Sequence, residues 1–226
     1  VTGRMTHMNP NVAQTTSGTK IYGSEMRACW VAEQGYSIVG MDASGLELRM
    51  LAHYMNDEEY LYEVVNGDVH TKNQRAAGLL TRDQAKTFIY AFLYGAGDAK
   101  IGSIIGGDAD AGRKLKAKFL HNTPALQALR DRVAQACKRG WLRGLDGRRI
   151  AVRSPHAALN TLLQGAGAVV MKQALINLHR FATAQQLDFK LVGNIQDEIQ
   201  SEVWDTHAER YGKLAAYAMT KAGEDF

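Results

Sequence analysis

One segment constrains the fold more than any other: the fourteen residues 82–95 have the pattern of a single helix. Thr81 can cap its first turn, Gln84 lies where a capping box needs it, and Gly95 is a natural C-terminal stop. Five apolar side chains recur at helical spacing and predict a buried face: Ala85, Phe88, Ile89, Phe92 and Leu93. The segment therefore predicts a helix that packs on one side against a core.

A second face of this helix carries four residues spaced by four: Arg82, Lys86, Tyr90 and Tyr94. Guanidinium and ammonium groups hold phosphate oxygens, and a tyrosine ring can stack on a base or a sugar. Two cations followed by two aromatic rings thus suit a polyphosphate joined to a flat base. A lone RxxxK pair on a helix is more often a solvated basic edge. Other motifs in the chain are therefore needed to support phosphate binding by this pair.

Carboxylates far apart in sequence are the second informative feature. Residues 36–41 predict a strand with Asp42 at its end, and 189–195 predict another strand, followed by a tight turn over 196–198 and a return strand. If these strands are neighbours in one sheet, Asp42 and Asp197 face each other at its edge. With substrate phosphates and water, two such carboxylates can hold two Mg²⁺ ions about 3.5–4 Å apart. An acidic pair at a hairpin tip is usually only a turn, so spacing alone does not settle its role.

Composition sets wider bounds. At 226 residues and 46% hydrophobic content, the chain predicts a globular protein with a sizeable core. A net charge of +4 and a pI of about 9.0 allow an acidic partner without establishing one. Cys29 and Cys137 indicate neither a disulfide framework nor a closely spaced metal pair, which fits a reducing cytosol. No signal peptide or membrane-spanning run is visible, and Val1 in place of Met indicates a fragment, a processed product or an engineered product.

Several segments resemble, in the correct order, the motifs of family A DNA polymerases, the class of bacterial DNA polymerase I. The likeness is greatest to replicative polymerases of short-tailed bacteriophages. It runs through nearly the whole chain, over residues 2–4 with Asn9, Pro10 and Asn11, then 42–49, 67–71, 82–95, 144–148, 153–164 and 197–198. Ordered motifs are far more specific than any one of them, and they favour the functional interpretation of both features above.

The resemblance implies an α+β fold: an antiparallel-sheet palm subdomain with a helical fingers subdomain, the right-hand polymerase core lacking a thumb. It assigns residues 1–55 and 156–226 to the palm and 56–155 to the fingers. A thumb and an exonuclease-type domain precede the palm in this family, whereas this chain begins inside the palm and stops early, at Phe226. Without a thumb we expect few phosphate contacts, salt-sensitive DNA affinity and poor processivity.

The implied function is template-directed DNA synthesis, in which a nucleotidyl group passes from a dNTP to a primer 3′-hydroxyl by two-metal-ion catalysis. The resemblance makes Asp42, Asp197 and the backbone of Ala43 the ligands of two Mg²⁺ ions. It places Glu198 and Lys86 beside Asp42 and Asp197 among the catalytic residues.

The same resemblance assigns binding roles by position. Residues that would contact the nucleotide are Arg82 and Lys86 at the triphosphate, His70 as a further phosphate contact, Tyr90 at the sugar and base, and Glu47 where a ribose 2′-hydroxyl would sit. Residues that would contact DNA are Arg4, Tyr94, His156, Asn160, Gln164 and Gln196. Without the surrounding motifs, Asn160 and Gln164 would be an ordinary i,i+4 polar pair, and Glu47 an exposed helix carboxylate.

Two positions depart from the common family pattern. Gln196 stands where the family usually has His before the acidic pair. Because Gln can still donate a hydrogen bond to the primer terminus, we expect the terminus to be positioned less firmly and the site to remain active. Tyr90 stands where many relatives carry Phe, and its hydroxyl predicts ready use of dideoxynucleotides.

Two other functions remain as alternatives: a non-catalytic remnant that holds primer–template, and a single-subunit phage RNA polymerase. Glu47 and the sequence around Asp42 speak against the RNA polymerase. The expected partners are primer–template DNA and dNTPs in the cytoplasm, or the host cytoplasm if a phage encodes the chain. A processivity factor stays an open partner of the full-length protein, but its usual docking site in the thumb is absent here.

Overall fold

The computed structural model describes residues 2–9 and 11–226, so Pro10 of the 9–11 motif lies outside the described residues. The chain divides into two compact units. One, the sheet unit, comprises residues 3–9, 11–44 and 167–226; the other, the helical unit, comprises residue 2 and residues 45–166. The long helix α9 (Ala158–Ala184) contributes residues to both.

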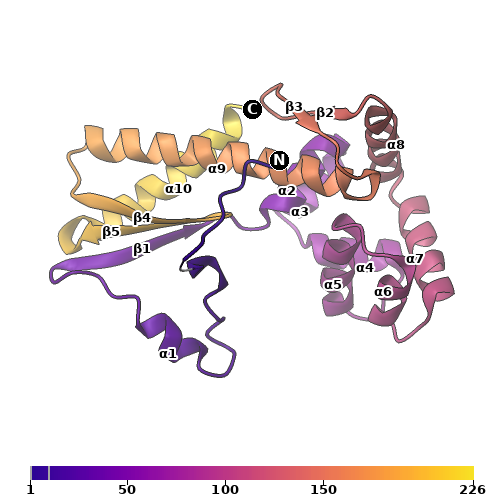
Figure 1. Ribbon diagram of the computed structural model, residues 1–226, viewed down its shortest axis with the longest axis horizontal. Coiled ribbons are helices and arrows are strands. Elements are labelled where there is room, and N and C mark those ends of the chain that lie inside the picture. The colour runs from indigo at the N-terminus through magenta and orange to yellow at the C-terminus, as the bar shows by residue number, and fades with distance from the viewer. Residues whose placement is uncertain (1, 10) are drawn as a thin grey trace. The chain divides into compact units, whose positions relative to one another are not determined.

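The sheet unit is built on three antiparallel strands in the order β1–β5–β4. The strands are β1 (Tyr36–Asp42), β4 (Phe189–Ile195) and β5 (Glu198–Trp204). Helix α10 (Ala208–Glu224) and the C-terminal part of α9 cover one face of this sheet (Figure 1). On α10, residues Tyr211, Ala215, Ala218 and Ala222 recur at helical spacing and are buried, which explains why this face packs on the strands.

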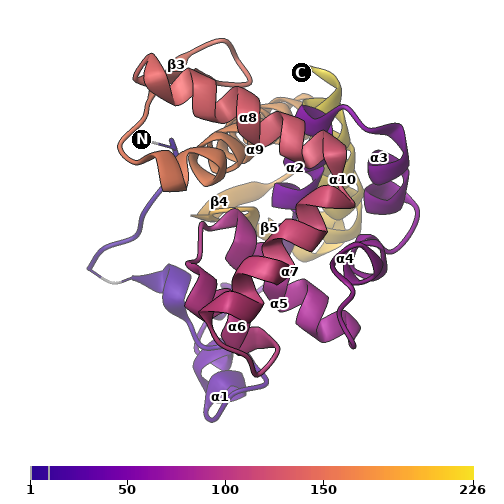
Figure 2. The same ribbon diagram turned by 90° about the vertical axis from the view of Figure 1, so that its right-hand side faces the viewer.

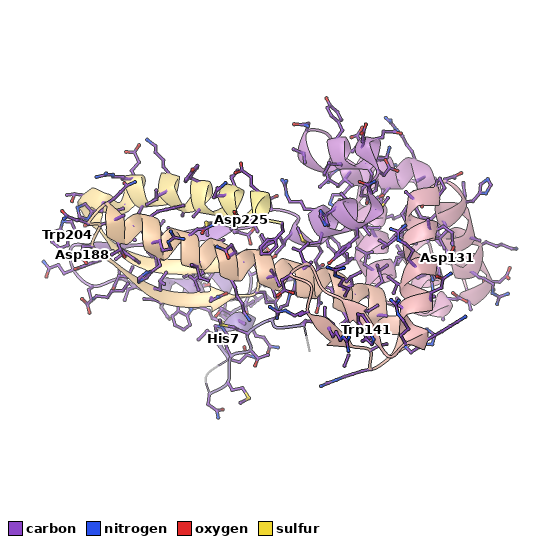
Figure 3. All side chains as sticks on the ribbon, turned by 90° about the horizontal axis from the view of Figure 1, so that it is seen from above. His7, Asp131, Trp141, Asp188, Trp204 and Asp225 are labelled. Atoms are coloured by element: carbon purple, nitrogen blue, oxygen red, sulfur yellow. The ribbon has the colours of Figure 1, made fainter. Side chains whose placement is uncertain are left out.

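The two ends of the sheet differ in character. At one end Trp204 packs edge-on against Tyr36, with ring centroids 5.2 Å apart, and the Tyr36 hydroxyl donates to Asp188 at 2.8 Å. Trp204 and Asp188 lie close together in Figure 3. At the other end, the two-residue turn Gln196–Asp197 joins β4 to β5. Gln196 has φ +59°, in the left-handed region that a non-glycine residue seldom occupies.

Short helices complete the sheet unit. The 3₁₀-helix η1 (Val12–Gln14) and helix α1 (Gly23–Ala28) precede β1, and η3 (Asp205–His207) links β5 to α10.

The helical unit has one hydrophobic core. The core contains the rings of Phe88, Phe92 and Phe119, whose centroids lie 5.0–5.8 Å apart. Figure 2 shows α5, α6 and α7, which supply or flank these rings, next to one another. The helices of this unit before its hairpin are α2 (Leu46–Met55), α3 (Glu58–Val65), α4 (Val69–Ala77), α5 (Arg82–Leu93), α6 (Asp98–Ile104), α7 (Ala109–His121) and α8 (Pro124–Lys138).

Helix α5 confirms the prediction made for residues 82–95. The Thr81 hydroxyl and the Gln84 side chain form both halves of the capping box. The five apolar residues predicted to face the core are all buried. Tyr94 is the C-cap and Gly95 follows with φ +75°, so the helix ends at Leu93, two residues before the predicted segment does.

The elements of the helical unit that were not predicted include helix α6 and a short hairpin. Helix α6 lies in the glycine-rich stretch after α5, where Gly102 is required because a Cβ there would lie 1.8 Å from the Asp108 carbonyl oxygen. A short hairpin of β2 (Trp141–Arg143) and β3 (Arg149–Ala151) has the 144–148 motif in its turn, and η2 (Pro155–Ala157) follows it. The guanidinium Cζ atoms of Arg139 and Arg149 lie over the ring of Trp141, labelled in Figure 3, at 5.1 and 4.7 Å from its centroid. Among the described residues, no helix is long and apolar enough to cross a bilayer.

Candidate active site

Carboxylate-bearing residues gather at one end of the sheet unit. In the β1–β5 register Asp42 lies opposite Glu198. The next residue, Ala43, donates its backbone N–H to the Asp197 carbonyl oxygen at 2.9 Å. Glu198, expected within the turn, is instead the first residue of β5, because the turn needs only Gln196 and Asp197. The structure thus brings Asp42 together with the adjacent pair Asp197 and Glu198, which lies far from it in sequence.

The negative charges at this end of the sheet affect one another. The pKa of Asp42 is raised above its usual value by partial burial, and further by the neighbouring charges of Asp197 and Glu198. The Glu198 carboxylate accepts a hydrogen bond from the Gln200 amide. A bound cation would relieve the remaining repulsion and favour the ionised form of Asp42.

The donor set suits one kind of metal site. Among the residues that the structure describes, no group of three or more His, Cys, Asp or Glu side chains forms a ready-made metal cluster. Two aspartates beside a backbone carbonyl make a sparse, all-oxygen set. Mg²⁺ is usually bound in this way, by one or two carboxylates together with substrate phosphates and water. The residues therefore fit a substrate-completed Mg²⁺ site rather than a closed structural site.

Helix α5 of the helical unit presents the two predicted phosphate ligands. Arg82 begins the helix and Lys86 follows one turn later, both with exposed side chains. The Arg82 guanidinium is bonded to Asp68 through two atoms, with Nε to Oδ2 at 2.7 Å and Nη2 to Oδ1 at 3.1 Å. Sequence reasoning missed this partner, although Asp68 lies in the 67–71 motif. Asp68 was predictable as the N-cap of a helix, because Asp is favoured there, but no local pattern pairs it with Arg82.

His70 lies beside this cationic face. Burial lowers the pKa of His70, and the charges of Arg82 and Lys86 lower it further against the opposing effect of Asp68. Its imidazole is therefore neutral at pH 7. His70 Nδ1 is buried and has no hydrogen-bond partner among the described residues. The ring of Tyr90 is tilted against that of His70, with centroids 6.3 Å apart. A phosphate or sugar oxygen near these residues would meet two cations, an imidazole and an aromatic ring.

Glu47 and Tyr94, predicted to have separate tasks, are bonded to each other. The Tyr94 hydroxyl donates to Glu47 Oε1 at 2.8 Å. The bond joins the first turn of α2 to the C-cap of α5. Any change in the position of Tyr94 is therefore coupled to the carboxylate predicted to exclude the 2′-hydroxyl.

The remaining predicted DNA contacts are spread over both units. In the sheet unit, Arg4 is half-buried near the N-terminus and Gln196 is exposed in the β4–β5 turn. In the helical unit, His156 is exposed in η2, and Asn160 and Gln164 are half-buried one turn apart on α9. The His156 carbonyl oxygen lies so near Gly95 that a Cβ there would be 2.6 Å away, which explains a glycine at the end of α5.

Comparisons with known proteins agree on one family. Residues 1–225 match the model of DNA polymerase family A. The "DNA-directed DNA polymerase" proteins of Enterobacteria phage T3 and Escherichia phage T7 are each 48% identical over 88% of this chain and 33% of their own length. A "DNA polymerase I, thermostable" of Thermus thermophilus is 28% identical over 98% of the chain and 29% of its own length.

A solved structure shares the fold. It is described as the POL domain of Pol1 from M. smegmatis in complex with DNA primer–template and dNTP. It matches 98% of this chain and 43% of its own, with a TM-score of 0.88 and 22% identity. The predicted α+β fold is thereby confirmed.

This chain spans about a third of the length of the phage relatives. Because the family model matches residues 1–225, the resemblance inferred from the motifs is confirmed. The chain belongs to DNA polymerase family A.

Proposed function

We propose that this chain carries out template-directed DNA synthesis, the transfer of a nucleotidyl group from a dNTP to a primer 3′-hydroxyl. One observation carries the proposal: Asp42, Asp197 and Glu198 gather at one end of an antiparallel sheet in a member of this family. The cationic face of α5 supports it independently, because it suits a triphosphate. We also retain the predicted domains, with the palm over 1–55 and 156–226 and the fingers over 56–155.

Asp42, Asp197 and the backbone carbonyl of Ala43 would hold Mg²⁺. Two bound Mg²⁺ ions would lower the pKa of the primer hydroxyl and neutralise the leaving pyrophosphate. The protein's task at this end of the sheet is to hold two carboxylates in fixed register. The β1–β5 pairing and the bond from Ala43 to Asp197 perform it. Glu198 adds a third negative charge.

On α5, Arg82 and Lys86 would bind the triphosphate, and His70 would donate to a phosphate oxygen. Tyr90 would lie against the base and sugar, with Glu47 occupying the space of a 2′-hydroxyl. Arg82 and Lys86 would first bind and orient the triphosphate. Lys86 can in addition stabilise charge that develops on the leaving phosphate.

Primer–template DNA and dNTPs are the partners in this proposal. Arg4, His156, Asn160 and Gln164 would contact the DNA backbone or minor groove, Tyr94 the template base, and Gln196 the primer terminus. The cytoplasm, where both substrates occur, is the proposed location. A processivity factor stays a prediction for the full-length protein.

Mg²⁺-dependent primer extension by the purified protein tests the proposal. Extension with dNTPs that stops on chelation supports it. Binding of primer–template without extension would favour the non-catalytic alternative. Preferential use of ribonucleotides would favour the RNA polymerase.

Removing the Glu47 carboxylate is expected to relax sugar selection. Glu47→Ala leaves room for a 2′-hydroxyl, so the ratio of ribonucleotide to deoxynucleotide incorporation should rise at least tenfold, which corresponds to about 1.4 kcal/mol or more in the barrier. Tyr94→Phe is the matched control, because it removes the 2.8 Å hydrogen bond but keeps the carboxylate. If single-nucleotide incorporation gives the same ratio of ribonucleotide to deoxynucleotide for Glu47→Ala and the parent, Glu47 does not exclude the 2′-hydroxyl.

The Tyr90 hydroxyl is expected to permit use of dideoxynucleotides, because it can take the place of the missing 3′-hydroxyl. Tyr90→Phe should lower the ratio of dideoxy to deoxy incorporation by roughly tenfold or more, the scale of a lost hydrogen bond in a desolvated site. Tyr62→Phe, on the exposed side of α3, should leave the ratio unchanged. Equal ratios for Tyr90→Phe and the parent would show that the Tyr90 hydroxyl does not contact the sugar.

A further inference from the structure

The contact between Asp68 and Arg82 is more specific than a surface ion pair. Both Asp68 oxygens are engaged by the guanidinium edge formed by Nε and Nη2. Such two-point geometry fixes the plane of the guanidinium as well as its distance. The Nη1 edge is turned away from Asp68, so the arginine can bind a second anion without releasing the first.

Asp68 is itself held rigidly. As the N-cap of α4, its Oδ1 accepts from the backbone N–H groups of His70 and Thr71, at 3.1 and 3.4 Å. Its Oδ2 accepts from the Thr71 hydroxyl at 2.7 Å. Arg82, and after it the hydroxyl and N–H of Thr71, hold the pKa of Asp68 well below its usual range, so the carboxylate is charged at neutral pH. The carboxylate is thus a fixed anchor rather than a mobile surface group.

Stability alone does not explain the pair. The side chains of Arg82 and Asp68 are 51% and 41% exposed, and exposed ion pairs contribute little to folding. An exposed arginine that binds a phosphate loses side-chain freedom when it does so. A partner that orders the guanidinium beforehand reduces that loss.

We propose that Asp68 is a positioning residue for nucleotide binding: it anchors Arg82 by one edge so that the other edge is presented to the incoming triphosphate. The inference rests on the proposed function of Arg82. Asp68 itself touches no substrate in this proposal. Its negative charge alone would weaken phosphate binding, so a favourable effect of Asp68 has to come from orientation.

The test is the equilibrium affinity of a dNTP for the purified protein on primer–template whose primer ends in a dideoxynucleotide. Asp68→Ala is expected to weaken that affinity roughly three- to tenfold, the cost of ordering one long side chain on binding. Asp68→Asn, which keeps the cap and an acceptor oxygen, should lose less. In an Arg82→Ala background, Asp68→Ala should have no further effect.

Asp57→Ala is the matched control. Asp57 caps α3 by accepting from the Tyr60 N–H at 2.9 Å, so its loss removes a helix cap without touching Arg82. The inference is overturned if Asp57→Ala weakens nucleotide affinity as much as Asp68→Ala does. It is also overturned if Asp68→Ala keeps or tightens affinity while Arg82→Ala weakens it, or if the two changes simply add. An unchanged affinity in Arg82→Ala would instead contradict the proposed function of Arg82, which separates the two failures.

Discussion

Replacing Asp197 with Asn is expected to lower primer extension by about three orders of magnitude while primer–template binding persists. Asn preserves the shape of the side chain but removes the charge that binds Mg²⁺, and several kcal/mol of transition-state stabilisation go with it. The rate of single-nucleotide incorporation at saturating Mg²⁺ measures the loss, and a filter or anisotropy assay measures DNA binding.

Asp188→Asn is the control for that experiment. Asp188 lies at the other end of the same hairpin, where it accepts from the Tyr36 hydroxyl, and Asn can still accept that bond. Its extension rate should stay close to that of the parent. Near-normal extension by Asp197→Asn would rule out the metal assignment, whatever the control shows.

Lys86→Ala is expected to weaken dNTP use by roughly ten- to a hundredfold and to leave primer–template affinity nearly intact. Loss of a charge-assisted bond to a phosphate, about 1.5–3 kcal/mol, sets this range. The KM for dNTP and the dissociation constant for DNA, measured at several salt concentrations, separate the two substrates.

Lys114→Ala provides the comparison. Lys114 is an exposed lysine of α7, paired with Asp110 within the same helix. Its loss changes the net charge equally without touching the α5 face. If Lys86→Ala flattened the salt dependence of DNA binding and kept the KM for dNTP, the lysine would serve DNA instead.

The elements that were predictable are those whose signals are local. The boundaries of α5 follow from Thr81, Gln84 and a five-residue apolar stripe, all within the helix or next to it. The β4–β5 hairpin and the end of β1 at Asp42 follow from apolar runs broken by polar residues. The order of the family motifs then indicated which carboxylates belong together.

The features that were missed depend on contacts distant in sequence or on very short elements. Helix α6 has only seven residues, and Gly102 lets it approach the backbone at Asp108. Strands β2 and β3 have only three residues each, too few for a period to show. The pairing of Arg82 with Asp68 joins two helices, and neither segment alone indicates it. The link from Tyr94 to Glu47 is of the same kind.

The pairing of β1 with β5 also sets the order in which the protein can mature. Most packing between helices of the helical unit joins elements that are neighbours in sequence, whereas Asp42 meets Glu198 only after most of the chain has been synthesised. Contacts of such high sequence separation form slowly, because a long loop must close first. A ribosome would therefore release a helical unit with an ordered core before Asp42 and Asp197 are neighbours. The nascent chain thus acquires the end of the sheet that carries Asp42 and Asp197 last, as one of the final events of folding.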